Sequence, residues 1–188
     1  MDAADAPRPW IGRSIPRVED AVLLRGGAAF VDDLPFPEAL HACFVRSPLA
    51  HGLLRHIGTE AARAVPGVHA VLCFADLRAV LTMDDIPLNL PAGGLRFDVN
   101  PTCLAIEEVS YVGEPVAIVL AESRRVAEDA AALVEVQIER LPAVVDPVDG
   151  LAANAPRARI GFADNLVAQT KVDYGDVEGA FKDRKSVV

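Results

Sequence analysis

Residues 110–136, SYVGEPVAIVLAESRRVAEDAAALVEV, decide the fold. The run VAIVLA (116–121) is continuously apolar, which predicts a strand buried on both faces. Ser123 stands where its hydroxyl can cap a following helix. One face of that helix carries the apolar residues at helical spacing, and we expect it to pack on the sheet: Val126, Ala130, Leu133 and Val134. The period then changes to two over residues 134–139, which predicts a half-exposed strand.

The residues before this stretch predict a second strand-helix-strand passage. ALHACFVR (39–46) has apolar side chains on both faces and is predicted to be an interior strand. LLRHI (53–57) predicts another strand, Thr59 can cap a short helix over 60–65, and VHAVLCF (68–74) is rich in β-branched residues. Helices and strands that alternate in this way predict an α+β fold, a mixed sheet with two packed helices.

The remaining segments have the composition of turns, loops and connections. Residues 1–27 are predicted to form an arm on another surface, with Trp10 as an anchor, because they carry prolines and no periodicity. Residues 82–102 hold three prolines and two glycines, so we expect a long excursion. The chain is loose from 142 until a short helix near its end, where the first residues of a further strand are predicted.

Composition restricts the classes of function. The chain has 188 residues, 52% of them hydrophobic, and a formal net charge of −9. This charge opposes binding to nucleic acid or to an anionic membrane, because both partners attract Lys and Arg. No apolar run approaches the ~18 residues of a membrane-spanning helix. The N-terminal sequence MDAADAPRPW is unlike a secretory signal, and we expect a cytoplasmic protein.

Glu114 is the most prominent candidate for a catalytic acid. It stands between Gly113 and Pro115, and no neighbour in sequence offers a charge that would shift its pKa. Pro115 restricts Glu114 to extended geometry, and Gly113 can adopt a turn that other residues resist. We therefore expect the start of a strand here and treat a small hydrolase that uses Glu114, or an aspartate pair, as a further hypothesis.

Other reactive residue types form no recognisable motif. The four histidines lack metal-binding spacing, and the three cysteines lack CxxC and are too few for an iron–sulfur cluster. The Gly26 and Gly93 pairs belong to no nucleotide-binding motif, and Ser47 is not in a GxSxG elbow. Asp32–Asp33 and Asp84–Asp85 have the composition of solvated turns. We predict no catalytic, cofactor-binding or metal-binding residue in this chain.

Five segments, in this order, resemble the large subunit of molybdenum hydroxylases, the family of xanthine dehydrogenase, aldehyde oxidase and aerobic carbon monoxide dehydrogenase. They are IPRVEDAVLLRGGAAFVDD, FVRSPLAH, PGVHAVL, SYVGEPVAIVLAESRRVAEDAAALVEVQIERLPAVVDP and GDVEGAF. The resemblance implies an α/β hammerhead domain over 28–145, followed by a linker and the start of the molybdopterin-binding domain over 146–188. No catalytic residue of the family maps onto these positions.

The resemblance implies a structural role. Molybdopterin would be held in the assembled enzyme by another chain or domain, with iron–sulfur centres and FAD on further domains or subunits, so we expect this chain to be inactive alone. It would be a separate small subunit, a truncated gene product or a piece of a longer chain. We expect the loops around 46–51 and 111–115 to form an interface, through Arg46, Ser47, His51, Tyr111, Gly113 and Glu114. The alternative is a stand-alone acidic module that binds a protein partner.

Overall fold

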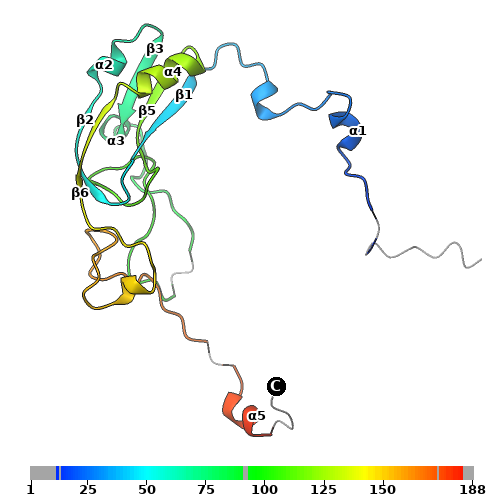
Figure 1. Ribbon diagram of the computed structural model, residues 1–188, viewed down its shortest axis with the longest axis vertical. Helices are drawn as coiled ribbons and strands as arrows, with labels where there is room; N and C mark the ends of the chain where they lie inside the picture. The colour runs from blue at the N-terminus through cyan, green and yellow to red at the C-terminus, as the bar shows by residue number, and fades with distance from the viewer. Residues whose placement is uncertain (1–11, 13, 91–92, 173, 184–188) are drawn as a thin grey trace, which may run out of the picture. The chain divides into compact units, whose positions relative to one another are not determined.

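The computed structural model describes residues 12, 14–90, 93–172 and 174–183 (Figure 1). The chain divides into two compact units, residues 1–39 and 40–188. In the described part of the first unit, helix α1 (Asp20–Leu23) and the 3₁₀ helix η1 (Val31–Asp33) are short, and no residue is buried. The arm over residues 1–27 stays a prediction, and its expected anchor, Trp10, lies outside the described residues.

Within its described residues, the second unit contains six strands in two antiparallel sheets. The strands are β1 (His41–Arg46), β2 (Gly52–Gly58), β3 (Val68–Cys73), β4 (Glu108–Val109), β5 (Pro115–Ala121) and β6 (Glu135–Arg140). One sheet has the order β1-β5-β3 and the other the order β4-β2-β6. Successive strands therefore alternate between the sheets. The α+β class is confirmed, but its strands form two antiparallel sheets in place of the expected mixed one.

Short helices of this unit connect the two sheets. Helix α2 (Glu60–Arg63) connects β2 to β3, and α4 (Arg124–Ala131) connects β5 to β6, so each joins one sheet to the other. Helix α4 packs against β1 and β5, and α2 packs against β3.

The central strand of the first sheet is β5, as its apolar run predicted. It pairs with β1 on one side and β3 on the other, and Val116, Ala117, Val119 and Ala121 are fully buried. The interior position predicted for the strand at 39–46 is wrong, because β1 is an edge strand with Ala42 and Phe44 exposed. Apolar periodicity reports the chemistry of a strand's faces and not whether another strand pairs on each side.

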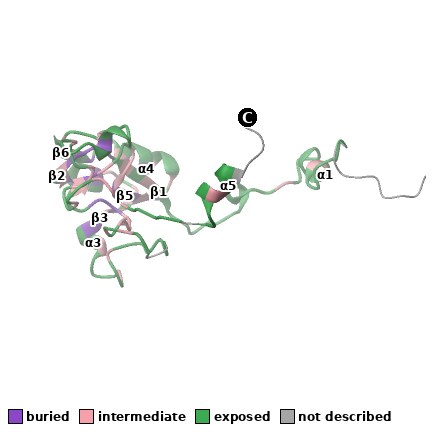
Figure 2. Ribbon diagram, turned by 90° about the horizontal axis from the view of Figure 1, so that it is seen from below, coloured by how far each residue is buried: buried purple, intermediate pink, exposed green. Residues whose placement is uncertain are grey.

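Two clusters of buried residues form the core. One contains Ala62, Val71, Val119, Ala130 and Val134, and the other contains Ala105, Val109 and Val116. Val45, Ile57 and Val136 pack against both clusters, so the two sheets share a continuous apolar interior. Figure 2 shows the buried residues gathered among the strands and the helices packed on them.

The helix predicted after Ser123 is confirmed, and its inner face is partly corrected. Ser123 Oγ accepts a hydrogen bond from Val126 N at 3.3 Å. Ala127 and Ala130 are buried, but Leu133 is 47% exposed and does not pack on the sheet. The helix ends at Ala131, so Leu133 lies beyond the turns to which helical spacing applies. Thr59 occupies the N-cap position of α2 without a side-chain capping bond.

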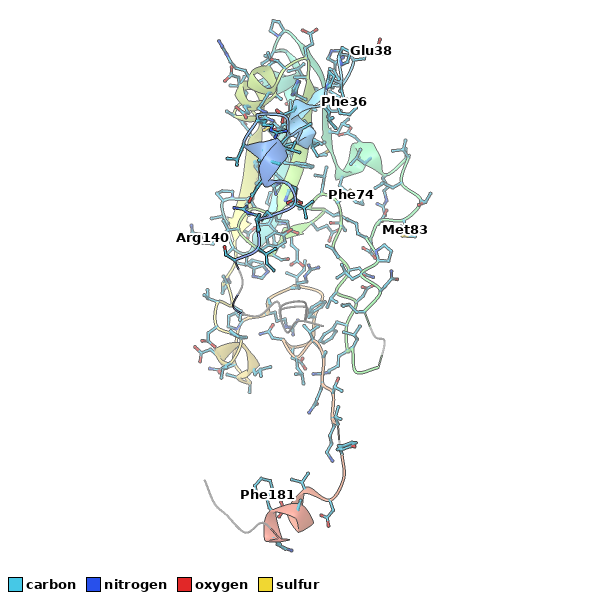
Figure 3. All side chains as sticks on the ribbon, turned by 90° about the vertical axis from the view of Figure 1, so that its right-hand side faces the viewer. Phe36, Glu38, Phe74, Met83, Arg140 and Phe181 are labelled. Atoms are coloured by element: carbon cyan, nitrogen blue, oxygen red, sulfur yellow. The ribbon has the colours of Figure 1, made fainter. Side chains whose placement is uncertain are left out.

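The remaining elements are small. Helix α3 (Phe74–Leu77) follows β3, the 3₁₀ helix η2 (Asp149–Leu151) lies in the later loop, and α5 (Val177–Asp183) is the predicted helix near the end of the chain. Phe181 on α5 and Met83 in the excursion are both exposed (Figure 3). The strand predicted after α5 falls outside the described residues.

Candidate functional site

The two loops predicted as an interface are hydrogen-bonded to each other. Gly113 N donates to Ser47 O at 2.8 Å, and Ser47 N donates to Glu114 O at 2.9 Å. The Arg46 guanidinium donates to Gly113 O at 2.9 Å. These bonds follow from the pairing of β1 with β5, which brings the end of one strand beside the start of the other. The structure therefore unites Arg46, Ser47, Gly113 and Glu114 in one site.

Glu114 closes the turn that leads into β5. Its Oε2 accepts a short hydrogen bond from Ser110 N, four residues earlier, and its own N–H donates to Tyr111 O at 3.3 Å. Gly113 has φ +91°, a left-handed conformation that favours glycine. The carboxylate thus satisfies a backbone donor of its own loop. This arrangement gives Glu114 a local structural role.

The six predicted interface residues differ in exposure. Ser47 is 2% exposed and His51 is 5% exposed, so their side chains are interior. Ser47 Oγ donates to Leu49 O at 2.9 Å and accepts from Leu49 N at 3.1 Å, which shapes the loop itself. Tyr111 is half exposed, and Arg46 is exposed with its guanidinium 5.3 Å from the Phe44 ring centroid. Arg46 and Tyr111 are the two of the six that present large side chains to solvent.

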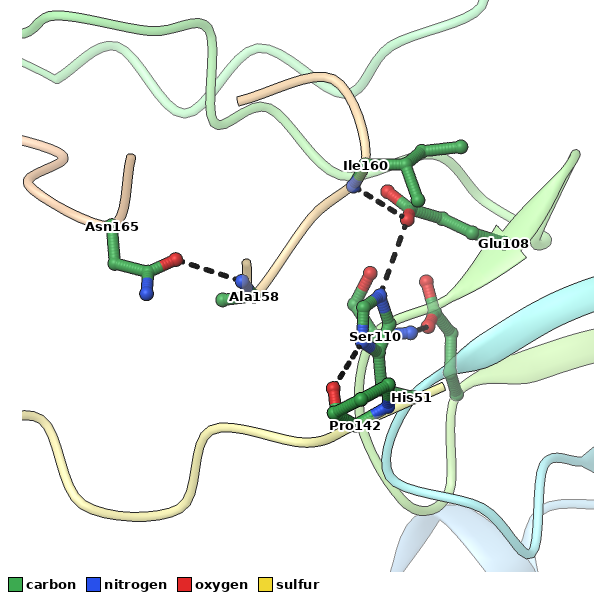
Figure 4. A network of polar contacts seen from close by, with 8 residues as sticks. His51, Glu108, Ser110, Pro142, Ala158, Ile160 and Asn165 are labelled. Atoms are coloured by element: carbon green, nitrogen blue, oxygen red, sulfur yellow. Dashed lines mark hydrogen bonds and ion pairs between the residues drawn. The ribbon is translucent and has the colours of Figure 1, made fainter. Parts of the chain in front are cut away.

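His51 is the centre of a buried polar network (Figure 4). Its Nδ1 lies 2.8 Å from Pro142 O, and its Nε2 lies 3.5 Å from Glu108 Oε2. The same Glu108 oxygen accepts a hydrogen bond from Ile160 N at 3.0 Å. Nε2 is a buried atom without a hydrogen-bond partner, and the Glu108 carboxylate is the charged group that faces it. Sequence reasoning missed Glu108, because its partners come from distant parts of the chain.

The excursion over 82–102 is ordered by a second set of contacts, with residues 162–169, that we call the clasp. Arg96 donates through both terminal nitrogens to Asp164, at 2.8 and 3.0 Å, and the Phe97 and Phe162 rings stack at 4.5 Å. Backbone bonds Arg96 N to Val167 O and Gln169 N to Gly94 O join the same segments. The long loop predicted from prolines and glycines is therefore held at its distal end by tertiary contacts.

Asn165 organises the segment that contributes to the clasp. Its side-chain Oδ1 accepts from Ala158 N at 2.7 Å, and its Nδ2 donates to Gly150 O and Pro156 O at 2.8 Å each. One side chain thus satisfies three backbone groups of a loop that has almost no regular structure. Nothing in the spacing of this polar sequence distinguishes Asn165 from its neighbours.

Two cavities adjoin these networks. One, of about 480 Å³, is lined by residues of both the Glu114 and the His51 networks: Arg78, Thr102, Ile106, Glu107, Glu108, Ser110, Glu114, Arg159, Ile160 and Gly161. The other, of about 750 Å³, lies between Arg96 and residues 150–169. Arg78 is paired with Asp84 at 2.9 Å. Three glutamates and two arginines line the smaller cavity, so its wall carries charges of both signs.

Two carboxylates, Asp76 after β3 and Asp164 in the clasp, have pKa values below the usual range. Asp76 accepts a hydrogen bond from Cys73 N at 2.8 Å, which lowers the pKa of Asp76 together with the bond from the Cys73 thiol. Burial, followed by the bond to Asp76, raises the pKa of the Cys73 thiol. The hydrogen bond from Leu166 N, and then Arg96, lowers the pKa of Asp164. Cys73 is therefore held as a thiol.

Within the described residues no group of three His, Cys, Asp or Glu side chains could hold a metal ion. Cys43, Cys73 and Cys103 are free and partly buried. The same part of the chain has no helix long and apolar enough to cross a membrane.

Residues 25–142 match the family model for the aldehyde oxidase and xanthine dehydrogenase α/β hammerhead domain. The chain belongs to this family. It is 41% identical over 96% of its length to the nicotine 6-hydroxylase large subunit of Paenarthrobacter nicotinovorans. It is 40% identical over 85% of its length to the carbon monoxide dehydrogenase large chain of Hydrogenophaga pseudoflava. The resemblance inferred from the five segments is confirmed.

Solved structures agree with this assignment to the hammerhead family. Quinoline 2-oxidoreductase from Pseudomonas putida 86 is similar with a TM-score of 0.75 and 34% identity over 94% of this chain. A Cu,Mo-CO dehydrogenase is similar with a TM-score of 0.68 and 34% identity over 93% of this chain. The hammerhead chain spans only 22% of the nicotine 6-hydroxylase subunit and 18% of the carbon monoxide dehydrogenase chain, about a fifth of each.

Proposed function

We propose that this chain is the structural hammerhead portion of a molybdenum-dependent hydroxylase or dehydrogenase, and that it assembles with the part of the enzyme that bears molybdopterin. The match of residues 25–142 to the hammerhead model carries the proposal. A relative in Escherichia coli, 34% identical, is named the xanthine dehydrogenase molybdenum-binding subunit. Residues 1–27 would be an arm, 28–145 the hammerhead domain, and 146–188 the connection to the molybdopterin-binding domain.

Two acidic side chains that line the smaller cavity, Glu108 and Glu114, are engaged in contacts within the chain. The His51–Glu108 pair faces inward and is joined to Pro142 O and Ile160 N, and Glu114 is bonded to the backbone of its own turn. We therefore assign no chemical step to this chain. Molybdopterin, iron–sulfur centres and FAD would lie on other domains or subunits, and the chain alone would be inactive. A cytoplasmic location stays a prediction.

The exposed side of the Arg46 and Tyr111 loops is the proposed contact surface. Tyr111 is 50% exposed, Val112 is 64% exposed, and Phe44, whose ring faces the Arg46 guanidinium, is 42% exposed on the edge strand β1. Aromatic and Arg side chains are enriched at protein interfaces. The backbone bonds between the two loops hold this surface in place before any partner binds, which lowers the entropic cost of association.

Native purification with site-specific cross-linking tests the proposal. A photoreactive residue at Tyr111 is expected to cross-link to a molybdenum-bearing chain or domain, identified by mass and by metal analysis of the purified complex. The same residue at Glu128, on the exposed face of α4, is the matched control and should give little of that product. Cross-linking from Tyr111 to a metal-free partner would instead favour the acidic binding module.

A further inference from the structure

While Glu108 is ionised, the ring of His51 needs a proton on each nitrogen to suit both of its neighbours. Pro142 contributes a carbonyl oxygen, which can only accept, so Nδ1 must carry a proton in the 2.8 Å contact. In a neutral ring Nε2 would then present a lone pair to the Glu108 carboxylate 3.5 Å away. Both groups would be acceptors, and the ring is 5% exposed, so little solvent screens their repulsion. A proton on Nε2 replaces this repulsion by an attraction.

Glu108 connects His51 to a segment that is distant in sequence. Its Oε2 is the atom that faces His51 and also the atom that accepts from Ile160 N at 3.0 Å. Hydrogen bonds to an ionised carboxylate are stronger than those to a neutral group. The connected groups run from Pro142 O through the His51 ring and the Glu108 carboxylate to Ile160 N. They join the start of β2, strand β4 and two loops.

We propose that His51 is a buried imidazolium, and that its ion pair with Glu108 is a latch that holds the segment around Ile160 against the β4-β2-β6 sheet. Glu108, Ile160 and Gly161 all line the cavity of about 480 Å³. The latch therefore fixes one wall of that cavity. Other charged residues on the surrounding elements are Glu107 before β4, Arg140 at the end of β6 and Arg159 beside Ile160. This inference is independent of the proposed assembly with a molybdopterin-bearing partner.

Nuclear magnetic resonance of the 188-residue chain shows directly which ring nitrogens of His51 carry a proton. Long-range ¹H–¹⁵N spectra at neutral pH are expected to show both His51 ring nitrogens protonated. In Glu108→Gln the carboxylate charge is removed, and the His51 ring should become neutral with its proton on Nδ1. A wild-type ring with an unprotonated Nε2 would overturn the proposal, and so would an imidazolium that persists in Glu108→Gln.

Amide hydrogen exchange tests the latch. Ile160 N–H should exchange faster in Glu108→Gln and in His51→Gln, whereas Val119 N–H in the core strand β5 should keep its protection and report that the variant is folded. Glu107→Gln, one residue away and exposed, is the matched control and should leave Ile160 unchanged. Unchanged exchange at Ile160 in both latch variants would overturn the proposal. If neither variant folds, the ring spectrum of the wild type still decides the charge state.

Discussion

At the scale of single residues, Glu114 shows how a carboxylate can serve a turn and not a reaction. Gly113 and Pro115 predicted the start of a strand, and the positive φ of Gly113 agrees. The partner of the carboxylate is the backbone N–H of Ser110, and a backbone donor cannot be recognised from residue types in the sequence. The His51–Glu108 pair was beyond sequence reasoning, because nothing in the spacing of these residues brings β2 beside β4.

Substitution of Glu114 distinguishes a structural role in the turn from a catalytic role. Glu114→Gln keeps an oxygen that can accept from Ser110 N, so the free energy of unfolding should change by less than about 0.5 kcal/mol. Glu114→Ala leaves a partly buried donor without its partner and should cost about 1 kcal/mol. Urea denaturation measures both, with Glu107→Ala as the exposed control. A loss of catalytic turnover in Glu114→Gln, with unchanged stability, would favour the hydrolase hypothesis instead.

The Cys73 thiol should become more reactive when the charge of Asp76 is removed. Burial is the main cause of its raised pKa, and the hydrogen bond and negative charge of Asp76 raise it further. Asp76→Asn keeps an acceptor for Cys73 N but loses the charge, so the thiol pKa should fall and alkylation at a fixed pH near 8 should be faster. The rate is measured in a background with Cys43→Ala and Cys103→Ala. An equal or slower rate would contradict this explanation.

At the scale of elements, the helix after Ser123 shows where periodicity stops being informative. Helical spacing correctly predicted the inner face between Val126 and Ala130, because the helix is regular there. The prediction failed at Leu133, which lies beyond the last helical residue. The chain turns at Ala132 to enter β6, and Val134 becomes the next buried residue. Small residues, Ala127 and Ala130, let α4 approach β1 and β5 closely.

Charges placed on the two sides of α4 should have very different costs. Ala130→Asp would bury an unpaired carboxylate at a position that is 0% exposed, and should lower the free energy of unfolding by about 3 kcal/mol or more. Leu133→Asp, at a position 47% exposed, should cost less than about 1 kcal/mol. Thermal and urea unfolding measure both, with Glu128→Ala as a neutral control. Equal effects at the two positions would contradict the assignment of Ala130 to the buried face of α4 and of Leu133 to solvent.

At the scale of the whole second unit, the arrangement is set by pairings that sequence patterns do not contain. The strands at 52–58, 68–73, 115–121 and 135–140 were predicted near their true positions. Their distribution between two sheets was not, because an alternating or apolar strand carries no record of its partner. The clasp is a similar case: Arg96, Phe97, Phe162 and Asp164 are unremarkable in sequence and come together only through the path of the excursion.

The clasp should open in acid. The pKa of Asp164 is lowered in the folded chain by the bond from Leu166 N and by Arg96, so its contribution to stability is present above the unfolded value of about 3.9 and is lost as pH falls through the lower folded value. Amide resonances of Leu166 and Gln169 should therefore be steady from about pH 7 to 5 and shift below about pH 4. Asp164→Asn should abolish this transition, while the amides of β5 stay unchanged. A transition above about pH 5 would contradict the assignment.

The alternation of successive strands between two sheets determines when the protein can fold. Strand β1 pairs with β5, and β2 pairs with β6, so the first two strands have no complete partner until residues 115–140 are available. Contacts between residues so far apart in sequence slow folding, since a long loop must close before they form. On a ribosome, the emerging N-terminal half would expose unpaired apolar strands until the second half is synthesised. Chaperones that shield such segments should therefore associate with this chain early and leave only after β6 has emerged.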